Sequence, residues 1–193
     1  MENKNKKRGL LIIMSGPSGV GKGTIREGLM KNKDLNLFYS VSMTTRNKRP
    51  GEENGREYYF VSREEFDKNI ETGNLLEWAE FVGNRYGTPK DKVEATRDEG
   101  KNVLLEIEVN GTSQVLEKVK GDDVISIFIA PPSIEELERR IRGRSTETDE
   151  VVKARLAKAV QELKFKDQYR YVVINDDLDR AVDEVRDIIV SKF

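Results

Sequence analysis

The sequence predicts an α/β fold in which helices cover both faces of a parallel sheet. Short apolar runs rich in β-branched residues recur along the chain, and such runs are typical of buried parallel strands. Amphipathic helical patterns separate them, and this alternation favours a parallel sheet. At 193 residues the chain suits a single domain. The four apolar runs span residues 10–14, 103–107, 124–129 and 171–174.

A glycine-rich loop directly follows the first apolar run and precedes a helical pattern. Its spacing, Gly-x4-Gly-Lys, is typical of a loop whose backbone N–H groups surround phosphate oxygens. The following helix adds the positive end of its dipole, and Lys22 supplies a cation for the outer phosphates. We therefore expect a nucleoside triphosphate site. Its expected residues are Gly16, Pro17, Ser18, Gly19, Val20, Gly21, Lys22, Gly23 and Thr24.

One position departs from the usual pattern of this loop. Gly23 stands where a serine or threonine usually follows the lysine, and Thr24 comes one residue later. Thr24 is therefore the candidate magnesium contact, either directly or through water, and the absence of any contact stays open.

Two stretches interrupt the alternation of strands and helices. Residues 35–90 are rich in Tyr, Phe, Thr and Gly and alternate as antiparallel strands would, so we expect an inserted lobe that binds substrate. Within it, a short helix capped at both ends is expected between Ser62 and Gly73. Residues 142–150 form a polar strip that predicts a mobile lid between two helices. The expected core comprises residues 9–34, 91–141 and 151–193.

The composition excludes several classes of chemistry. Charged residues make up 36% of the chain but leave a net charge of only −1, which argues against a protein that coats nucleic acid. There is no cysteine and no histidine, so disulfides, thiolate metal sites and a histidine base are excluded. Phosphoryl transfer remains possible, because it depends mainly on positioning and charge stabilisation. Residues 1–8 are basic and indicate a frayed tail rather than a signal peptide, and no segment reaches membrane length, so we expect a cytoplasmic protein.

Two arginines and two tyrosines of the inserted stretch are candidates for binding a phosphate. Arg46 and Arg49 could both reach one phosphate from a loop, although a solvated basic turn is the alternative. Tyr58 and Tyr86 each follow a turn and could donate a hydrogen bond to a phosphate oxygen. Half-buried packing is the alternative for both rings.

Carboxylates within apolar stretches are candidates for reading a base. Glu77 lies in the run Leu-Leu-Glu-Trp-Ala, and a carboxylate there needs a partner. Guanine offers two adjacent donors to one carboxylate, whereas adenine offers no such pair. Glu106 and Glu108 end a core strand, where they could order magnesium-bound water or face the base. A solvated or ion-paired glutamate is the alternative at each position.

Arginines flank the predicted lid and could neutralise the charge that develops on a transferring phosphoryl group. A solvated helix face is the alternative, because glutamates lie at helical spacing from several of them. We assign that alternative to Arg139 and Arg142. The remaining candidates are Arg140, Arg144 and Arg155.

From about residue 9 to the end, the chain resembles the guanylate kinases. The resemblance implies a P-loop kinase with a parallel-sheet core, an inserted GMP-binding lobe and a short lid. The segments that carry it are GPSGVGKGT at 16–24, SMTTR at 42–46 with Arg49, GREYYF at 55–60, LLEWAEF at 75–81, GNRYGTP at 83–89, LLEIEVNG at 104–111, IAPPS at 129–133, GRSTET at 143–148 and VINDDLD at 173–179.

The resemblance also implies an activity, the transfer of the ATP γ-phosphoryl group to GMP, with magnesium and without a covalent intermediate. Asn175 would lie against the adenine of ATP. Residues implied around the guanine base are Ser42, Glu77, Thr88 and Glu108. Residues implied around the GMP phosphate are Arg46, Arg49, Tyr58 and Tyr86. Residues implied around the transferred group are Lys22, Arg140, Arg144 and Arg155.

Alternative functions are weighed against this resemblance. Some guanylate kinase-like domains are inactive modules that bind proteins, but here Lys22, the loop glycines and the lid arginines are all present. An adenylate or pyrimidine kinase would share the loop but not the combination of Glu77 with Ser42. Glu106 and Glu108 are longer than the aspartates often found in that strand of the family, so Glu77 is the stronger candidate for base contact. The expected partners are ATP and GMP, without nucleic acid, a membrane or an obligate protein partner.

Overall fold

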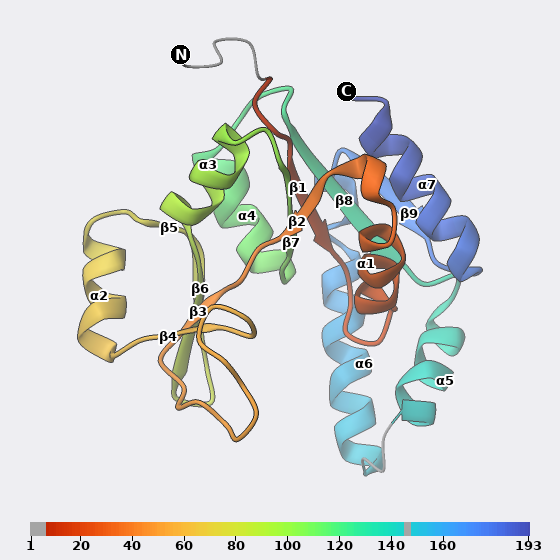
Figure 1. Cartoon of the computed structure of the whole chain (residues 1–193). Helices are drawn as coiled ribbons and strands as arrows, with labels where there is room; N and C mark the ends of the chain where they lie inside the picture. Colours follow the sequence, from red (N-terminus) through yellow and green to blue (C-terminus); the bar gives the residue numbers. More distant parts are fainter. Residues whose placement is uncertain (1–6, 145–147) are drawn as a thin grey trace.

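The computed structural model describes residues 7–144 and 148–193, except for the side chain of Arg144. The five strands of the larger sheet are all parallel to their neighbours, and the sheet lies between two groups of helices (Figure 1). All four apolar runs of the sequence form strands of this sheet, so the predicted α/β fold is confirmed. In spatial order the strands are β2 (Leu37–Tyr39), β7 (Asn102–Glu106), β1 (Leu11–Ser15), β8 (Val124–Ala130) and β9 (Tyr171–Ile174).

The central strand β1 is buried on both faces, because its alternate side chains pack against different helices. Ile12 and Met14 belong to one hydrophobic cluster, with α1 (Lys22–Met30), α5 (Ile134–Arg144), α6 (Asp149–Leu163) and α7 (Leu178–Val190). Leu11 and Ile13 belong to another, with α3 (Lys90–Asp98) and α4 (Val109–Lys118). Because both faces are covered, a continuous apolar run is the expected sequence for such a strand.

A second, smaller sheet forms a separate layer, drawn at the left of Figure 1 with α2 (Arg63–Glu71) beside it. Its own small core contains Met43, Phe66 and Leu75, and the ring of Trp78 meets that of Phe66 edge-on. In spatial order its strands are β4 (Tyr59–Phe60), β3 (Met43–Thr44), β6 (Asn84–Pro89) and β5 (Leu75–Phe81). Within the described residues there are also two short 3₁₀ helices, η1 (Lys33–Leu35) and η2 (Lys166–Gln168).

The first part of the stretch 35–90 corrects the expectation that all of it lies in an inserted lobe. Strand β2 pairs in parallel with β7 and is the edge of the five-stranded sheet. Strands β3 and β4 are also parallel, so antiparallel pairing is confined to β3, β6 and β5. Because an edge strand is partly solvated, as the exposed Phe38 shows, its sequence alternates like a strand of an antiparallel sheet.

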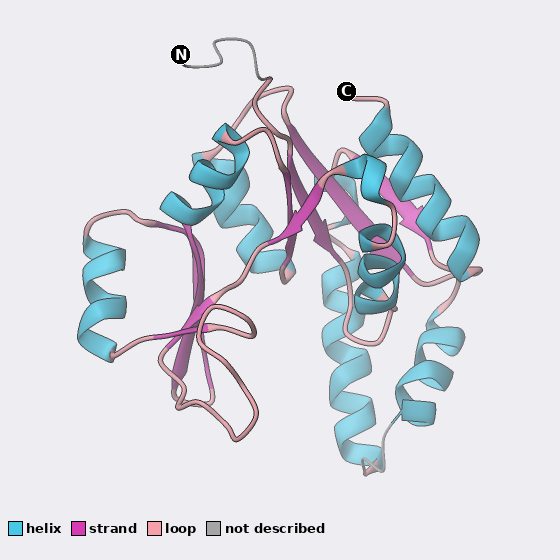
Figure 2. Cartoon of the chain, viewed as in Figure 1, coloured by secondary structure: helices cyan, strands magenta, loops and turns pink. Residues whose placement is uncertain are grey.

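The predicted start of α2 at Ser62 is confirmed by a capping hydrogen bond, and Ser133 caps α5 in the same way. Figure 2 shows the helices of the core on both sides of its strands. The Oγ atom of Ser62 accepts from the backbone N–H of Glu65, and that of Ser133 from Glu136, both at 3.1 Å. Helix α2 is followed by Gly73 with a φ of 67°, a conformation that glycine adopts readily.

The helices that flank the expected lid extend further than the sequence predicts. Helix α5 continues to Arg144 and α6 begins at Asp149, while residues 145–147 lie outside the described part of the chain. Most of the expected basic tail also lies outside it, but Arg8 forms ion pairs with Glu94 and Asp98 of α3. No helix within the described ranges combines the length and the apolar character needed to cross a bilayer.

Candidate active site

The glycine-rich loop forms one wall of a cleft of about 440 Å³ at the carboxyl edge of the five-stranded sheet. The loop connects the end of β1 to the start of α1, which has no acidic residue in its first turn. Backbone N–H groups and the helix dipole therefore favour an anion at this position. The opposite wall contains Glu106, Ile107 and Glu108, which follow β7, and Glu162 of α6.

Two loop glycines are required by close approach as well as by backbone conformation. At Gly16, which has a φ of 147°, a Cβ atom would lie 2.2 Å from the carbonyl oxygen of Ile129 in β8. At Gly21, which has a φ of 104°, a Cβ atom would lie 2.5 Å from Nδ2 of Asn175. Asn175 is buried and donates from Nδ2 to the carbonyl of Val20 at 2.8 Å. The residue implied beside adenine therefore supports the loop directly.

Lys22 folds back over the loop. Its Nζ atom donates to the carbonyl oxygens of Gly16 at 2.6 Å and Pro17 at 3.0 Å. Burial lowers the pKa of Lys22, and the nearby charges of Glu106 and Glu162 oppose that shift. An ammonium group held by two carbonyl oxygens can exchange them for phosphate oxygens without a change in its own charge.

Two of the three candidate lid arginines contact the loop or its support. Arg140 donates to the carbonyl oxygens of Asn175 at 2.9 Å and Val20 at 3.3 Å. Arg155 donates to Oγ of Ser18 at 2.9 Å. The side chain of Arg144 lies outside the described part of the structure. Arg139 and Arg142 pair with Glu136 and Glu138, as the sequence predicts.

Glu77 is buried, with only 8% of its surface exposed, so the solvent-facing alternative is wrong. The hydroxyl of Thr88 donates to its Oε1 atom at 2.6 Å. Burial raises the pKa of the Glu77 carboxyl, the Thr88 hydrogen bond and the charge of Lys118 oppose the shift, and the charge of Glu108 adds to it. Gly111 of α4 makes room for this carboxylate, because a Cβ atom there would lie 2.9 Å from Oε2 of Glu77.

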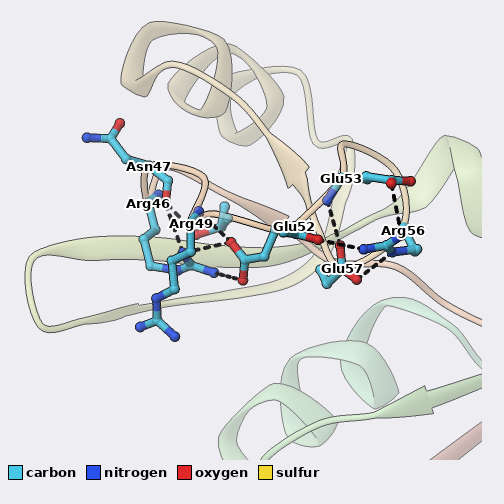
Figure 3. Close-up of polar contacts among 9 residues, drawn as sticks. Arg46, Asn47, Arg49, Glu52, Glu53, Arg56 and Glu57 are labelled. Atoms are coloured by element: carbon cyan, nitrogen blue, oxygen red, sulfur yellow. Dashed lines mark hydrogen bonds and ion pairs between the residues drawn. The ribbon is translucent and has the colours of Figure 1, made fainter.

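Arg46, Tyr58 and Tyr86 lie together on the smaller sheet and the loop beside it. The guanidinium of Arg46 is 5.4 Å from the centre of the Tyr58 ring, and that ring meets Tyr86 edge-on at 5.8 Å. Arg46 also donates to both carboxylate oxygens of Glu52, at 2.8 and 3.1 Å. That pairing lowers the pKa of Glu52. Arg49 donates only its backbone N–H to Glu52, while its guanidinium points away from that carboxylate (Figure 3).

The remaining candidates are Ser42, Glu108 and Thr24. Ser42 lies half-buried just before β3, where its carbonyl accepts from the backbone N–H of Tyr59 at 2.8 Å. Glu108 immediately precedes α4 and is exposed, with both carboxylate oxygens 3.1 Å from Nζ of Lys158. Thr24 is exposed on α1 and is absent from the residues that line the cleft.

The carboxylates of the cleft do not form a metal site by themselves. Glu106 is held by Arg26 at 2.9 Å, and no group of three or more acidic residues in the described ranges is placed to hold a metal ion. Hard oxygen donors do line the cleft beside the phosphate loop, which fits a magnesium ion that arrives on nucleotide phosphates.

The sequence reasoning missed four residues around this site. Glu52 holds Arg46, and Gly111 makes room for Glu77. The acidic residue within a basic turn, and the Asn-Gly pair at 110–111, were available signals for these two. Lys158 and Glu162 contact or line the cleft from α6, but their four-residue spacing is equally typical of a solvated helix face.

A parallel sheet whose central strand leads through a phosphate-binding loop into a helix, with arginines from α5 and α6 reaching that loop, is the architecture of a P-loop kinase. The family model for guanylate kinase matches residues 8–192, and the chain belongs to the guanylate kinase family.

Relatives named guanylate kinase are similar along nearly all of this chain. The one from Malacoplasma penetrans is 53% identical over the whole chain and 97% of its own length. The one from Lactococcus lactis is 51% identical over 97% of the chain and 90% of its own length. The one from Mesoplasma florum is 55% identical over 97% of the chain, and the chain spans only 62% of the length of that relative.

Solved structures agree with this assignment. The crystal structure of guanylate kinase from Anaplasma phagocytophilum superposes with a TM-score of 0.73 at 36% identity, covering 97% of this chain and 87% of that one. A shikimate kinase from Bacteroides thetaiotaomicron has a TM-score of 0.50 at 14% identity, over 94% of this chain and 98% of that one, a likeness of fold alone.

Proposed function

We propose that this chain transfers the γ-phosphoryl group of ATP to GMP, giving ADP and GDP. The observation that carries the proposal is the buried carboxylate of Glu77, held at one oxygen by Thr88. A buried carboxylate needs hydrogen-bond donors, and the N1–H and exocyclic amine of guanine supply two that lie side by side. Ser42 and Glu108 complete the proposed base site.

The donor site of the proposal is the cleft beside the glycine-rich loop. Lys22 and the backbone N–H groups bind the ATP phosphates, and Asn175 lies near the adenine. Magnesium bound to ATP would shield phosphate charge, and Glu106, which lines the cleft, would hold its water molecules. Residues proposed to neutralise the transferring group are Arg140, Arg144 and Arg155.

The acceptor phosphate needs alignment more than activation. Arg46, Arg49, Tyr58 and Tyr86 orient the GMP phosphate, whose anionic oxygen attacks the γ-phosphorus. One P–O bond forms as the bond to the ADP oxygen breaks, so neither a base nor a covalent intermediate is required. ATP and GMP are the partners that the reaction needs, and we infer a cytoplasmic enzyme because these nucleotides are substrates of the cell interior.

Measuring ADP release with ATP and a panel of monophosphates tests the base site. Wild type should use GMP and discriminate against AMP by up to about 10⁴–10⁵ in kcat/KM, because AMP leaves the carboxylate unpaired. Glu77→Gln should lose about 2–4 kcal/mol of transition-state stabilisation with GMP, because one acceptor becomes a donor. With IMP, which lacks the exocyclic amine, Glu77→Gln should lower kcat/KM by less than it does with GMP.

The matched control is Glu80→Gln, which changes an exposed glutamate of the same strand β5 and should leave GMP use unchanged. Normal GMP efficiency in Glu77→Gln, or equal losses with all three nucleotides, would remove the main support for guanine recognition.

Lys22→Ala separates an active kinase from an inactive protein-binding module. If the proposal holds, wild type turns over and Lys22→Ala loses most turnover, while calorimetry still detects GMP binding on the smaller sheet. A wild-type protein that binds GMP but releases no ADP would favour the module.

A further inference from the structure

Glu162 is a buried carboxylate with one oxygen atom, Oε2, that lacks a hydrogen-bond partner among the described residues. It is 9% exposed and lines the nucleotide cleft from α6. Burying an ionised carboxylate is costly unless a cation or several donors face it. A cation that moved onto Glu162 would therefore be stabilised there.

Lys158 lies one helical turn before Glu162 and is close to two carboxylates at once. Its Nζ atom is 3.1 Å from both oxygens of Glu108 and 3.8 Å from Oε1 of Glu162. The side chains of Lys158 and Glu108 are 55% and 72% exposed, whereas that of Glu162 is 12% exposed. Exposed ion pairs are weak, so Lys158 can leave Glu108 easily and has a buried acceptor within reach.

The Lys158–Glu108 pair joins the two sides of the active site. Glu108 precedes α4, close enough to Glu77 for its charge to act on that carboxyl. Lys158 is part of α6, which also carries Arg155 on the phosphate loop. The ion pair is therefore a tether between the proposed guanine site and the helix that reaches the donor phosphates.

We propose that Lys158 exchanges Glu108 for Glu162 when GMP binds, and so couples occupation of the acceptor site to the position of α6. The inference rests on the proposed GMP site, in which Glu108 faces the base beside Glu77. After the exchange, Lys158 and Glu162 pair within one helix at a spacing of four residues, and the tether across the cleft is released. Lys158 and Glu162 are positioning residues in this scheme.

Calorimetry with a non-hydrolysable ATP analogue, with and without GMP, measures the coupling. Wild type should bind the analogue about two- to fivefold more tightly with GMP, the range set by an exposed ion pair. Lys158→Met should bind it without GMP as tightly as wild type does with GMP, since the tether is already absent. Lys158→Arg should behave as wild type. The matched control Lys153→Met, on an exposed position of the same helix, should also keep the wild-type coupling.

Glu162→Gln provides a test of opposite sign. Without a charged acceptor for the displaced lysine, GMP should bind more weakly than to wild type, whereas Lys158→Met should bind GMP more tightly. Unchanged coupling in Lys158→Met, or weaker binding of the analogue to it, would overturn the inference, because simple loss of structure cannot tighten binding. Wild-type phosphorylation of GMP without coupling would overturn the inference and leave the proposed function intact, whereas no GMP phosphorylation would overturn the proposed function.

Discussion

At the scale of single residues, a group in the active site can favour ligand binding and still destabilise the free folded protein. Glu77 is the main example. Its burial raises the pKa of the carboxyl, so the ionised form that would bind guanine is also the form that the free protein accommodates poorly. We therefore expect guanine recognition and stability to conflict at this position.

Glu77→Gln should stabilise the free protein in a pH-dependent way. A carboxyl whose folded pKa is raised contributes stability below its unfolded pKa of about 4.3, and that contribution is lost as the pH rises through the folded pKa. The free energy of unfolding of Glu77→Gln minus that of wild type should therefore increase as the pH rises, then level off. Urea unfolding between acidic and neutral pH measures this difference. A difference in unfolding free energy that stays constant, or that falls with pH, would contradict a raised pKa. At neutral pH, saturating GMP should make this difference smaller, because it binds the folded wild type more tightly than the variant.

Gly111→Ala should impair the base site without affecting the donor site. The added methyl group would lie 2.9 Å from Oε2 of Glu77, and that carboxylate is held in place by Thr88. Overpacking of this kind costs about 1–3 kcal/mol, which we expect in kcat/KM for GMP. Separate titrations of GMP and ATP in the ADP-release assay measure it, with Glu117→Ala on an exposed position of α4 as the control. A raised KM for ATP with normal GMP use would contradict this placement of Gly111.

At the scale of elements, α3 is positioned by a buried arginine as well as by the apolar contact of Val93. Arg97 is 1% exposed, and its guanidinium donates to the carbonyl of Gly9 at 3.0 Å and to Asp123 at 2.5 Å. It thus joins α3 to the residues that precede β1 and β8.

Arg97→Met should destabilise the protein by about 1.5–3 kcal/mol, because it removes charged hydrogen bonds and leaves the buried carbonyl of Gly9 without this donor. The free energy of unfolding in urea measures the loss, while kcat per folded molecule should stay normal because α3 does not line the cleft. The control is Arg186→Met, which breaks exposed ion pairs on α7 and should change little. Equal effects of the two substitutions would mean that Arg97 acts as an ordinary surface residue.

Elements with a strong local signal were predictable from the sequence. The core strands are continuous apolar runs because both sheet faces are covered, and α2 and α5 begin at serines that cap them. Helix α3 was not predicted, because few of its side chains are buried and one of these is Arg97. The expected lobe at 35–90 includes β2, because an edge strand and an antiparallel strand share the same alternation.

The residues of the candidate site were predictable from the sequence where their type is unusual for the surrounding residues. The loop at 16–24 and Glu77 are such cases, since glycines before a lysine, or a carboxylate in an apolar strand, need a special reason. The partners that position these residues were not predictable. Glu52, Lys158 and Glu162 resemble any other charged residue in the sequence, and only burial and contacts distinguish them.

At the scale of the whole molecule, the proposed reaction needs the two sheets and the α5–α6 region to approach both nucleotides together. The proposed acceptor residues lie on the smaller sheet and the phosphate loop on the larger one, so closure around the substrates is expected. A fully compact chain of this length has a radius of gyration of about 16 Å.

Small-angle scattering should detect this closure. The free protein should have a radius of gyration above that compact value, and GMP with a non-hydrolysable ATP analogue should lower it towards about 16 Å. Glu77→Gln, measured at the same nucleotide concentrations, should remain closer to the free state. Identical scattering with and without both nucleotides would argue against closure.

Lys7 and Lys192 lie next to each other, with Nζ of Lys7 donating to the carbonyl of Lys192 at 3.1 Å. Both lie near Leu10 and Asn102 at the end of the larger sheet opposite the phosphate loop, and Figure 1 shows the C-terminus there, near the top. A purification tag, a surface-immobilisation linker or a fused fluorescent domain attached after Phe193 would therefore extend away from the cleft. The C-terminal end can carry such an attachment without blocking nucleotide entry, and donor and acceptor dyes for distance measurements belong instead on the smaller sheet and α6.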